Sequence, residues 1–268
     1  MRFMMQSSQI ERKFNMLPSN CQGIFQILDL ENYQADDENN SFESEELQAF
    51  LNISKELVSG GATGSESYPG ELLPPMNANV ILPDSILDLL IDYYNRAYVE
   101  YNFSRPRLDF SSSSENYIAV TGKVTQYGRL RIGAEYFGSI LSKRHIRSSY
   151  ILVRFIDRFN NINTYPGQVQ FYFKHIIHLS DSSIKHHLAF VNWYEPVTSA
   201  DTRFLFANNE DSSDFTNDPE LWKKIFLKTS VDSIIPVHHI LSRFVPAKFK
   251  YERTDYLAIL PLNRRFHF

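Results

Sequence analysis

The chain has 268 residues, of which 43% are hydrophobic and 14% aromatic, so it is long enough to bury one sizeable core or two small ones. Its single cysteine, Cys21, excludes an internal disulfide and a cysteine-based zinc finger. The net charge of −4 is unevenly spread, because residues 1–118 carry 7 basic and 18 acidic side chains whereas residues 119–268 carry 20 and 13.

The composition also bears on the compartment. The first residues, MRFMMQSSQIERKF, lack the apolar segment of a signal peptide, and no apolar run is long enough to span a membrane. One cysteine in the whole chain suits a reducing environment. We therefore expect an intracellular protein that does not enter a membrane.

Residues 1–80 have the composition of an acidic leader. The segments 36–40 (DDENN) and 59–67 (SGGATGSES) are typical of linkers. Between them, residues 41–58 combine an acidic first turn with a loose apolar stripe, which predicts one short helix. We expect the leader to be largely disordered and the folded domain to occupy residues 81–268.

Residues 84–100, DSILDLLIDYYNRAYVE, form the clearest helix of the sequence. Apolar and aromatic side chains, Leu90 and Tyr93 among them, recur at helical spacing on one face. Asp84 or Ser85 is positioned to cap the first turn. An aromatic stripe at this spacing is typical of a core contact, so we expect the helix to pack against a sheet.

Strand patterns follow the helix. Alternation and β-branched or aromatic content predict strands at residues 117–124, 129–132, 150–157, 168–178 and 187–194. In the fourth of these, the apolar side chains at 169, 171 and 173 point one way, and Gln170, Tyr172 and Lys174 point the other. The fifth is apolar on both faces and should be a central strand.

The last part of the chain predicts one more helix and further strands. Asp218, Pro219 and Glu220 make a typical helix start, so residues 218–228 are expected to form an inserted helix. Short strands are expected at 233–237, 240–245 and 256–260. The predicted fold is therefore mainly β with flanking helices, a small closed or partly open β-barrel with an inserted helix.

The histidines do not form a metal-binding pattern. His175 and His178 are three residues apart, so they point to opposite faces of a strand, and the adjacent pairs at 186–187 and 238–239 also diverge. The sequence contains no nucleophile elbow, phosphate-binding glycine loop or kinase signature. We therefore expect no catalytic residues, no metal and no cofactor, although an enzyme of unrecognised type stays as a third alternative.

The basic residues suggest a contact surface. Two arginines share one face of the strand at 129–132, and the turn that follows at 142–147 is rich in Lys and Arg. The candidate strip for phosphate or partner contact consists of Arg129, Arg131, Lys143, Arg144 and Arg147. An ordinary solvated surface explains the same residues. Tyr172 and Tyr194 are the candidates for an exposed aromatic surface that stacks on bases or forms part of a methyl-ammonium cage.

From residue 81 onward the sequence resembles a family of uncharacterised open reading frames that are expanded in early-diverging, mucor-like fungi and associated with DNA transposons. The matching segments are ILPDSILDLLIDYYNRAY (81–98), QYGRLRIGAEYFGSILSKRHIRSSYILVRF (126–155), YPGQVQFYFKHIIHL (165–179), LAFVNWY (188–194), LWKKIF (221–226), SIIPVHHILSRFVPAKFK (233–250) and YLAILPLNRRFHF (256–268). The family implies a transposon-derived protein in which this region is an accessory module.

At the level of the fold, LAFVNWYEP followed at a distance by DSIIPVHHIL is similar to the bromo-adjacent homology (BAH) domain of chromatin proteins, which is an SH3-like β module. This resemblance implies a non-enzymatic module that binds chromatin proteins, histone tails or other proteins, in the nucleus rather than the cytoplasm. Direct binding of DNA or RNA through the basic strip is the first alternative. The oligomeric state stays open.

Overall fold

The computed structural model describes residues 62–67, 70–106, 117–133, 135–156, 162–179, 182–206 and 219–262. All of them belong to one of the two contact units of the chain, residues 52–264. The predicted mainly β composition is confirmed, because most of the described chain forms one ten-stranded antiparallel sheet. The helix expected at residues 41–58 lies outside the described residues.

The described residues form strands for the most part, joined by a few helices and 3-10 turns. In chain order, the strands are β1 (Gly70–Ile81), β2 (Phe103–Ser104), β3 (Ile118–Ala119), β4 (Lys123–Ile132), β5 (Glu135–Phe137), β6 (Tyr150–Ile156), β7 (Ile162–His178), β8 (Ser183–Pro196), β9 (Glu220–Phe226), β10 (Ile234–Pro236), β11 (Ile240–Tyr251) and β12 (Thr254–Pro261). The helices are α4 (Asp84–Ala97) and α5 (Ala200–Arg203), with 3-10 turns η1 (Lys143–Ser148), η3 (Val231–Ser233) and η4 (Val237–His239).

Six of the strands close on themselves. β7 pairs with β6, β6 with β11, β11 with β12, β12 with β9, β9 with β8, and β8 pairs again with β7. Inside this six-strand ring, Tyr194 of β8 lies with its ring centroid 6.4 Å from that of Phe244 on β11, although the two strands are not neighbours. The buried core of the ring comprises Leu152, Tyr194, Trp222, Phe244, Leu257 and Ile259.

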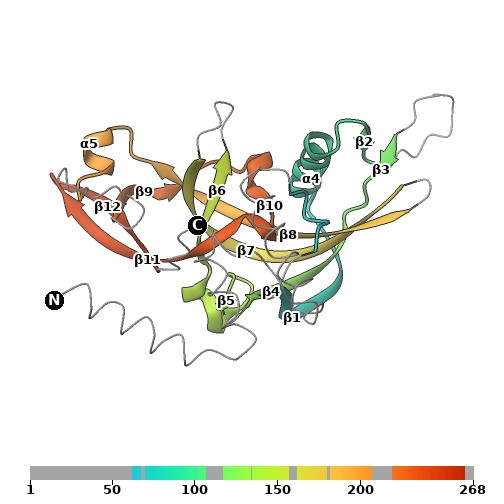
Figure 1. The fold of residues 1–268 in the computed structure, drawn as a ribbon, viewed down its shortest axis with the longest axis horizontal. Coiled ribbons are helices and arrows are strands. Elements are labelled where there is room, and N and C mark those ends of the chain that lie inside the picture. The colour runs from blue at the N-terminus through green and yellow to red at the C-terminus, as the bar shows by residue number, and fades with distance from the viewer. Residues whose placement is uncertain are drawn as a thin grey trace, which may run out of the picture. The chain divides into compact units, whose positions relative to one another are not determined.

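β7 and β8 continue beyond the ring as a long hairpin, which Figure 1 shows running past α4. Along this part β7 also pairs with β4, β4 with β1, and β8 with β10. One face of the hairpin packs against α4 through Leu90, Tyr94, Phe173, Ile177 and Leu188. Each leucine or phenylalanine buried there contributes about 1.5–3 kcal/mol to folding, so the helix and the hairpin stabilise each other.

A β-bulge at Gln170 reverses the alternation of β7. Val169 lies opposite Val191 and Phe171 lies opposite Phe190, so Gln170 is an extra residue in β7. Val169 therefore shares its core with Tyr172, whereas Phe173 belongs to the core beneath α4. The prediction that residues 169, 171 and 173 share one face is wrong, because a bulge moves every later side chain to the other face.

The inserted helix predicted at 218–228 is wrong. Residues 220–226 form β9, which pairs with β12 and β8 and completes the six-strand ring. Trp222 lies opposite Leu257, is 1% exposed, and donates its indole N–H to Glu220 at 3.2 Å. The tertiary pairing overrides the local helix signal, because an open gap between β12 and β8 would leave both strands with unpaired backbone groups. Asp218, the expected cap, lies outside the described residues.

The expected boundary of the leader at residue 80 is also wrong for the part that the structure describes. Residues 70–80 belong to β1, which pairs along most of β4. Residues 62–67, which have a linker composition, are hydrogen-bonded to α4 and β8. Gly64 permits this close approach because it has no side chain, since a Cβ there would lie 2.9 Å from a methyl group of Leu188.

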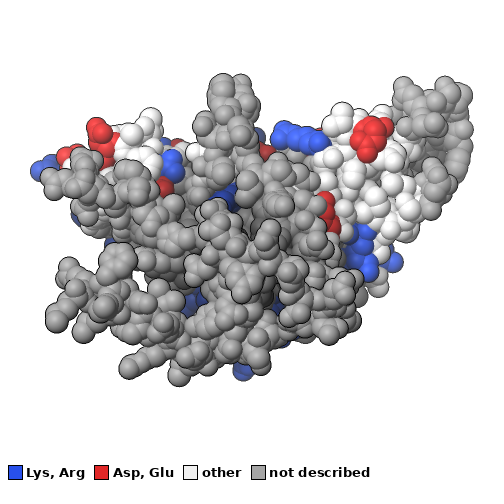
Figure 2. All heavy atoms as spheres, viewed as in Figure 1, with Lys and Arg blue, Asp and Glu red and all other residues white. Residues whose placement is uncertain are grey.

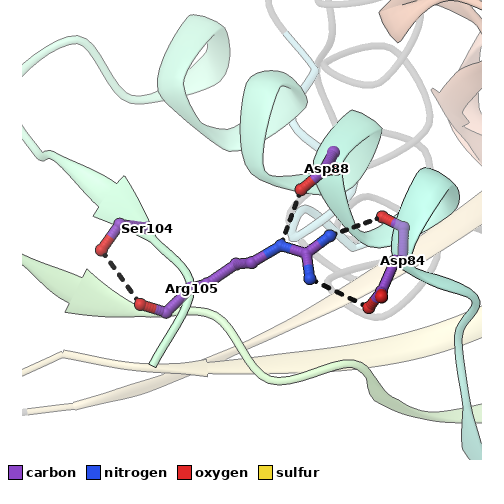
Figure 3. A network of polar contacts seen from close by, with 4 residues as sticks. All are labelled: Asp84, Asp88, Ser104 and Arg105. Carbon is purple, nitrogen blue, oxygen red and sulfur yellow. Dashed lines mark hydrogen bonds and ion pairs between the residues drawn. The ribbon is translucent and has the colours of Figure 1, made fainter. Parts of the chain in front are cut away.

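The helix predicted at 84–100 is confirmed as α4, although it ends at Ala97. Its first turn is held differently from the expectation. The N-cap residue is Pro83, and no side chain caps the helix. Arg105 instead donates to the Asp84 carboxylate at 2.9 Å, to the Asp84 carbonyl at 3.0 Å and to Asp88 at 2.8 Å (Figure 3). The Ser104 hydroxyl donates to the Arg105 carbonyl at 3.3 Å. The aspartates therefore fasten the following loop to the helix.

Candidate functional site

The outer part of the β7–β8 hairpin, residues 172–178 and 183–189, has two faces of opposite character. Lys174 lies opposite His187 and Ile176 lies opposite Lys185, so these four side chains share one face, which we call the lysine face. His175 lies opposite His186 on the other face, which we call the histidine face. α4 covers the histidine face, whereas the lysine face borders an open groove.

The groove on the lysine face, which we call the lysine groove, has a volume of about 370 Å³. Thr125 of β4 lies opposite Lys174, and continuation of this register places Lys123 level with Ile176. Three adjacent strands therefore each contribute a lysine: β4, β7 and β8. The groove is lined by Asn79, Thr121, Lys123, Val124, Thr125, Lys174, Ile176, His178 and Lys185.

Within the described part of the chain, the three lysines of the groove have no acidic side chain in contact with them. Among the described residues none of them forms an ion pair, and no Asp or Glu lines the groove. Lys174 Nζ lies 5.2 Å from the ring centroid of Tyr127, a cation–π contact that leaves its charge in place. Because uncompensated cations at a concave surface attract anions, the lysine groove is a candidate site for phosphate groups.

A second, more open hollow shares Lys174 and Lys185 with the lysine groove and includes Glu66 and Glu71. Both acids are occupied elsewhere. Glu71 forms an ion pair with Arg131 at 2.9 Å, and Glu66 accepts hydrogen bonds from the backbone N–H groups of residues 63 and 64. Neither acid forms an ion pair with a lysine of the groove, although the carboxylate of Glu66 stays charged beside it.

The histidine face holds a buried network of tyrosines and histidines. The Tyr94 hydroxyl lies 2.8 Å from Nδ1 of His175, and Nε2 of that histidine lies 2.9 Å from the Thr121 carbonyl. A carbonyl only accepts, so Nε2 carries the proton and Tyr94 donates to Nδ1. Alongside, the Tyr98 hydroxyl lies 2.7 Å from Nε2 of His186.

The segment 62–67 closes one side of this network, and we call it the strap. The Tyr93 hydroxyl donates to the Thr63 carbonyl at 2.8 Å, and the Tyr98 hydroxyl lies 3.1 Å from Thr63 Oγ1. His238 Nε2 lies 3.1 Å from the backbone oxygen of Glu66 and donates to it. The strap is therefore attached to α4 and to η4 by side chains that are far away in the sequence.

Burial sets the charge state of these groups. Burial lowers the pKa of His175 to about 4, and burial together with His175 lowers the pKa of His186 to about 4. Burial raises the pKa of Tyr94 well above its usual value of 10. Burial alone would raise the pKa of Glu66, but hydrogen bonds from Thr63 and from the Glu66 backbone, together with the nearby His238, lower that pKa overall. The histidine face is therefore neutral at pH 7, and its chemistry is structural.

The residues of the predicted basic strip are divided between two settings. Arg129 donates to the Pro74 carbonyl at 2.6 Å and lies 3.4 Å from His145 of η1, so β4 and η1 do meet there. Arg131 is paired with Glu71. Three members remain exposed on η1, namely Lys143, Arg144 and Arg147. The two strand arginines are thus already occupied, whereas the η1 cations are available.

The predicted aromatic surface is wrong. Tyr172 is fully buried, and its hydroxyl donates to the Gly138 carbonyl at 3.2 Å. Tyr194 is 7% exposed and stacks on Phe226 with ring centroids 4.6 Å apart. The bulge at Gln170 turns Tyr172 inward, and closure of the six-strand ring encloses Tyr194, and neither event is visible in the local pattern.

The lysine groove itself was not predicted from the sequence. Lys174 was placed on the outward face of its strand, but Lys123 and Lys185 are isolated cations in the sequence, and only the pairing of β4, β7 and β8 brings the three together. Residues 185–187 read Lys-His-His, so the alternation of polar and apolar side chains is lost there. The available indication in the sequence was one lysine in or just before each of the predicted strands 117–124, 168–178 and 187–194.

The described residues contain no group of three or more His, Cys, Asp or Glu side chains arranged to hold a metal ion. In the same part of the chain, no helix is both long and apolar enough to cross a membrane. On the face drawn in Figure 2, basic and acidic side chains of described residues are interspersed at both ends rather than separated by sign. No protein-family model, curated protein or solved structure matches this chain.

Proposed function

We propose that this chain is a non-enzymatic module that binds nucleic acid through phosphate contacts in the lysine groove. One observation carries the proposal: three lysines from three adjacent strands surround a groove that no described acid lines. Lysine and arginine contacts to phosphates supply most of the affinity of sequence-independent nucleic-acid binding. Thr121, Thr125 and Asn79 add hydroxyl and amide groups that hydrogen-bond to phosphate oxygens.

The test is binding of the full chain to a labelled DNA across a salt series, with three triple variants that each remove the same charge. The groove variant changes Lys123, Lys174 and Lys185 to Gln. The second variant changes Lys143, Arg144 and Arg147 to Gln. The control changes Lys224, Lys228 and Lys250, three exposed lysines of the described chain outside the groove, to Gln.

If the lysine groove is the binding site, the groove variant is expected to lose most of the binding. The slope of log K against log salt is expected to become shallower by about 2 to 3, because each of the three phosphate contacts contributes about 0.7 to 0.9. A loss of binding in the second variant alone would place the nucleic-acid site on η1 instead. Equal loss in all three variants, or no binding by the unmodified chain at low salt, would overturn the proposal.

The chromatin- or protein-binding role and the BAH-like fold remain a second proposal. Two features support it: the six-strand ring, and the order in which LAFVNWYEP lies on β8 while DSIIPVHHIL spans η3 to the start of β11, with β9 between them. The aromatic residues expected to form a methyl-ammonium cage are buried, so this proposal lacks a described site. Binding of histone-tail peptides that is insensitive to salt and to the groove variant would favour it over nucleic-acid binding.

A further inference from the structure

The floor of the lysine groove is apolar at its centre. Ile176 is 43% exposed and lies opposite Lys185 on β8, with Lys123 level with it on β4. Lys123, Ile176 and Lys185 therefore form a row across three strands, in which an aliphatic side chain lies between two cations. Adjacent strands are about 4.8 Å apart, so the two lysine α-carbons are about 10 Å apart with the isoleucine between them.

This arrangement matches a ligand with two chemical parts. Phosphate groups suit the lysines, whereas an exposed aliphatic side chain is stabilised by contact with an apolar or planar group. In a duplex the base faces are stacked and paired, so a duplex meets such a row with its phosphates alone. A single strand exposes base faces, which contact apolar and aromatic side chains between phosphate-binding cations.

The size of the groove agrees with this distinction. A volume of about 370 Å³ lies in the range of sites that enclose a small ligand, and is suited to one strand passing through rather than to a duplex lying inside. Asn79 on β1 borders the groove, and the hydroxyls of Thr121 and Thr125 lie along β4 and just before it. These groups are available to the edges of unpaired bases.

We infer that the lysine groove prefers single-stranded nucleic acid to duplex, with Ile176 contacting an unpaired base between phosphates held by Lys123 and Lys185. This inference rests on the proposed function and names the form of nucleic acid that the site takes. The lysines supply attraction for either form, and Ile176 supplies the difference between them.

The experiment measures fluorescence anisotropy of the full chain with a labelled oligothymidylate and with a duplex of the same length at one salt concentration. The single strand is expected to bind at least about tenfold more tightly. Ile176→Thr, which keeps a β-branched side chain, is expected to weaken single-strand binding about five- to tenfold and duplex binding less than about twofold. Ile225→Thr is the matched control, because Ile225 is an exposed isoleucine on β9 outside the groove, and it should change neither.

Thermal unfolding of both variants checks that the fold is intact. Equal or tighter binding of the duplex, or an equal loss for both nucleic acids in Ile176→Thr, would overturn the inference and leave nucleic-acid binding in place. Absence of binding to either nucleic acid would overturn the proposed function as well. Failure of the inference and failure of the proposed function therefore give different results.

Discussion

The two faces of the outer β7–β8 hairpin differ although they are made by the same strands. Lys185 and His186 are neighbours in the sequence, yet Lys185 is exposed at the lysine groove and His186 is fully buried beneath Tyr98. Lys174 and His175 differ in the same direction, the lysine half-buried and the histidine buried. Alternation separates the neighbours, and the cover supplied by α4 decides which face is buried. The residue types along the two strands therefore do not identify the binding face by themselves, because the face that α4 buries must also be known.

The strongest test of the difference between the two faces is to replace each of the two neighbouring residues by the other type, one at a time. His186→Lys places an unpaired charge on the buried face, so the free energy of unfolding is expected to fall by about 3–5 kcal/mol. Lys185→His, one residue earlier on the exposed face, is expected to change it by less than about 0.5 kcal/mol. Urea unfolding at pH 7 measures both. Similar losses in the two variants would show that the faces are not different.

The second test of the buried histidine face is the pH dependence of the free energy of unfolding. His175 and His186 have folded-state pKa values of about 4, against 6.5 for an exposed histidine. Between pH 6.5 and pH 4 the unfolded chain binds more protons, so each of them lowers the free energy of unfolding by about 1.4 kcal/mol per pH unit as the pH falls. Above pH 6.5 they add no pH dependence.

Urea unfolding at several pH values between 7 and 4.5 gives this slope, with the ionic strength held constant. His187 and His239 also have pKa values lowered to about 4. His175→Gln therefore removes one of four such contributions and should flatten the profile by the amount of one histidine. A profile that stays level from pH 7 to pH 5 in the unmodified chain would contradict the buried, neutral state of the histidine face.

The smallest effect on the free energy of unfolding is expected for the loop that follows α4. Arg105 binds Asp84 and Asp88 at the start of α4, but its side chain is 41% exposed (Figure 3). Exposed ion pairs contribute little, so Arg105→Gln is expected to lower the free energy of unfolding only slightly, and far less than His186→Lys lowers it. Arg144→Gln on η1 is the control and should have no effect. A loss as large as that of His186→Lys would mean that the packing of α4 depends on this surface network rather than on Leu90 and Tyr94.

Elements with a strong local pattern were predictable. The apolar spacing of residues 84–100 predicted α4, and the β-branched and aromatic runs predicted β6, the outer part of β7 and the central position of β8. His175 and His178 were expected on opposite strand faces, and one is buried while the other is exposed. These predictions depend on periods of 3.6 and 2 residues, which are local properties of the chain.

Features that depend on distant partners were not predictable in the same way. The segment 220–226 has a helix start signal, but it forms β9 because β12 and β8 offer backbone partners on both sides. Residues 62–67 look like a linker, but Tyr93 of α4, Tyr98 just after it and His238 hydrogen-bond to them. Short-range preferences of less than about 1 kcal/mol per residue yield to such contacts.

The sequence by itself determined that the chain is rich in strands, that one amphipathic helix precedes them, and that lysines and histidines are neighbours at residues 174–175 and 185–187. Only the tertiary structure decided that six strands close into a ring, that α4 covers the histidines, and that Lys123 joins Lys174 and Lys185 around one groove. The physical reason is that alternation is fixed between neighbouring residues, whereas cover and pairing are set by segments that are far apart along the chain.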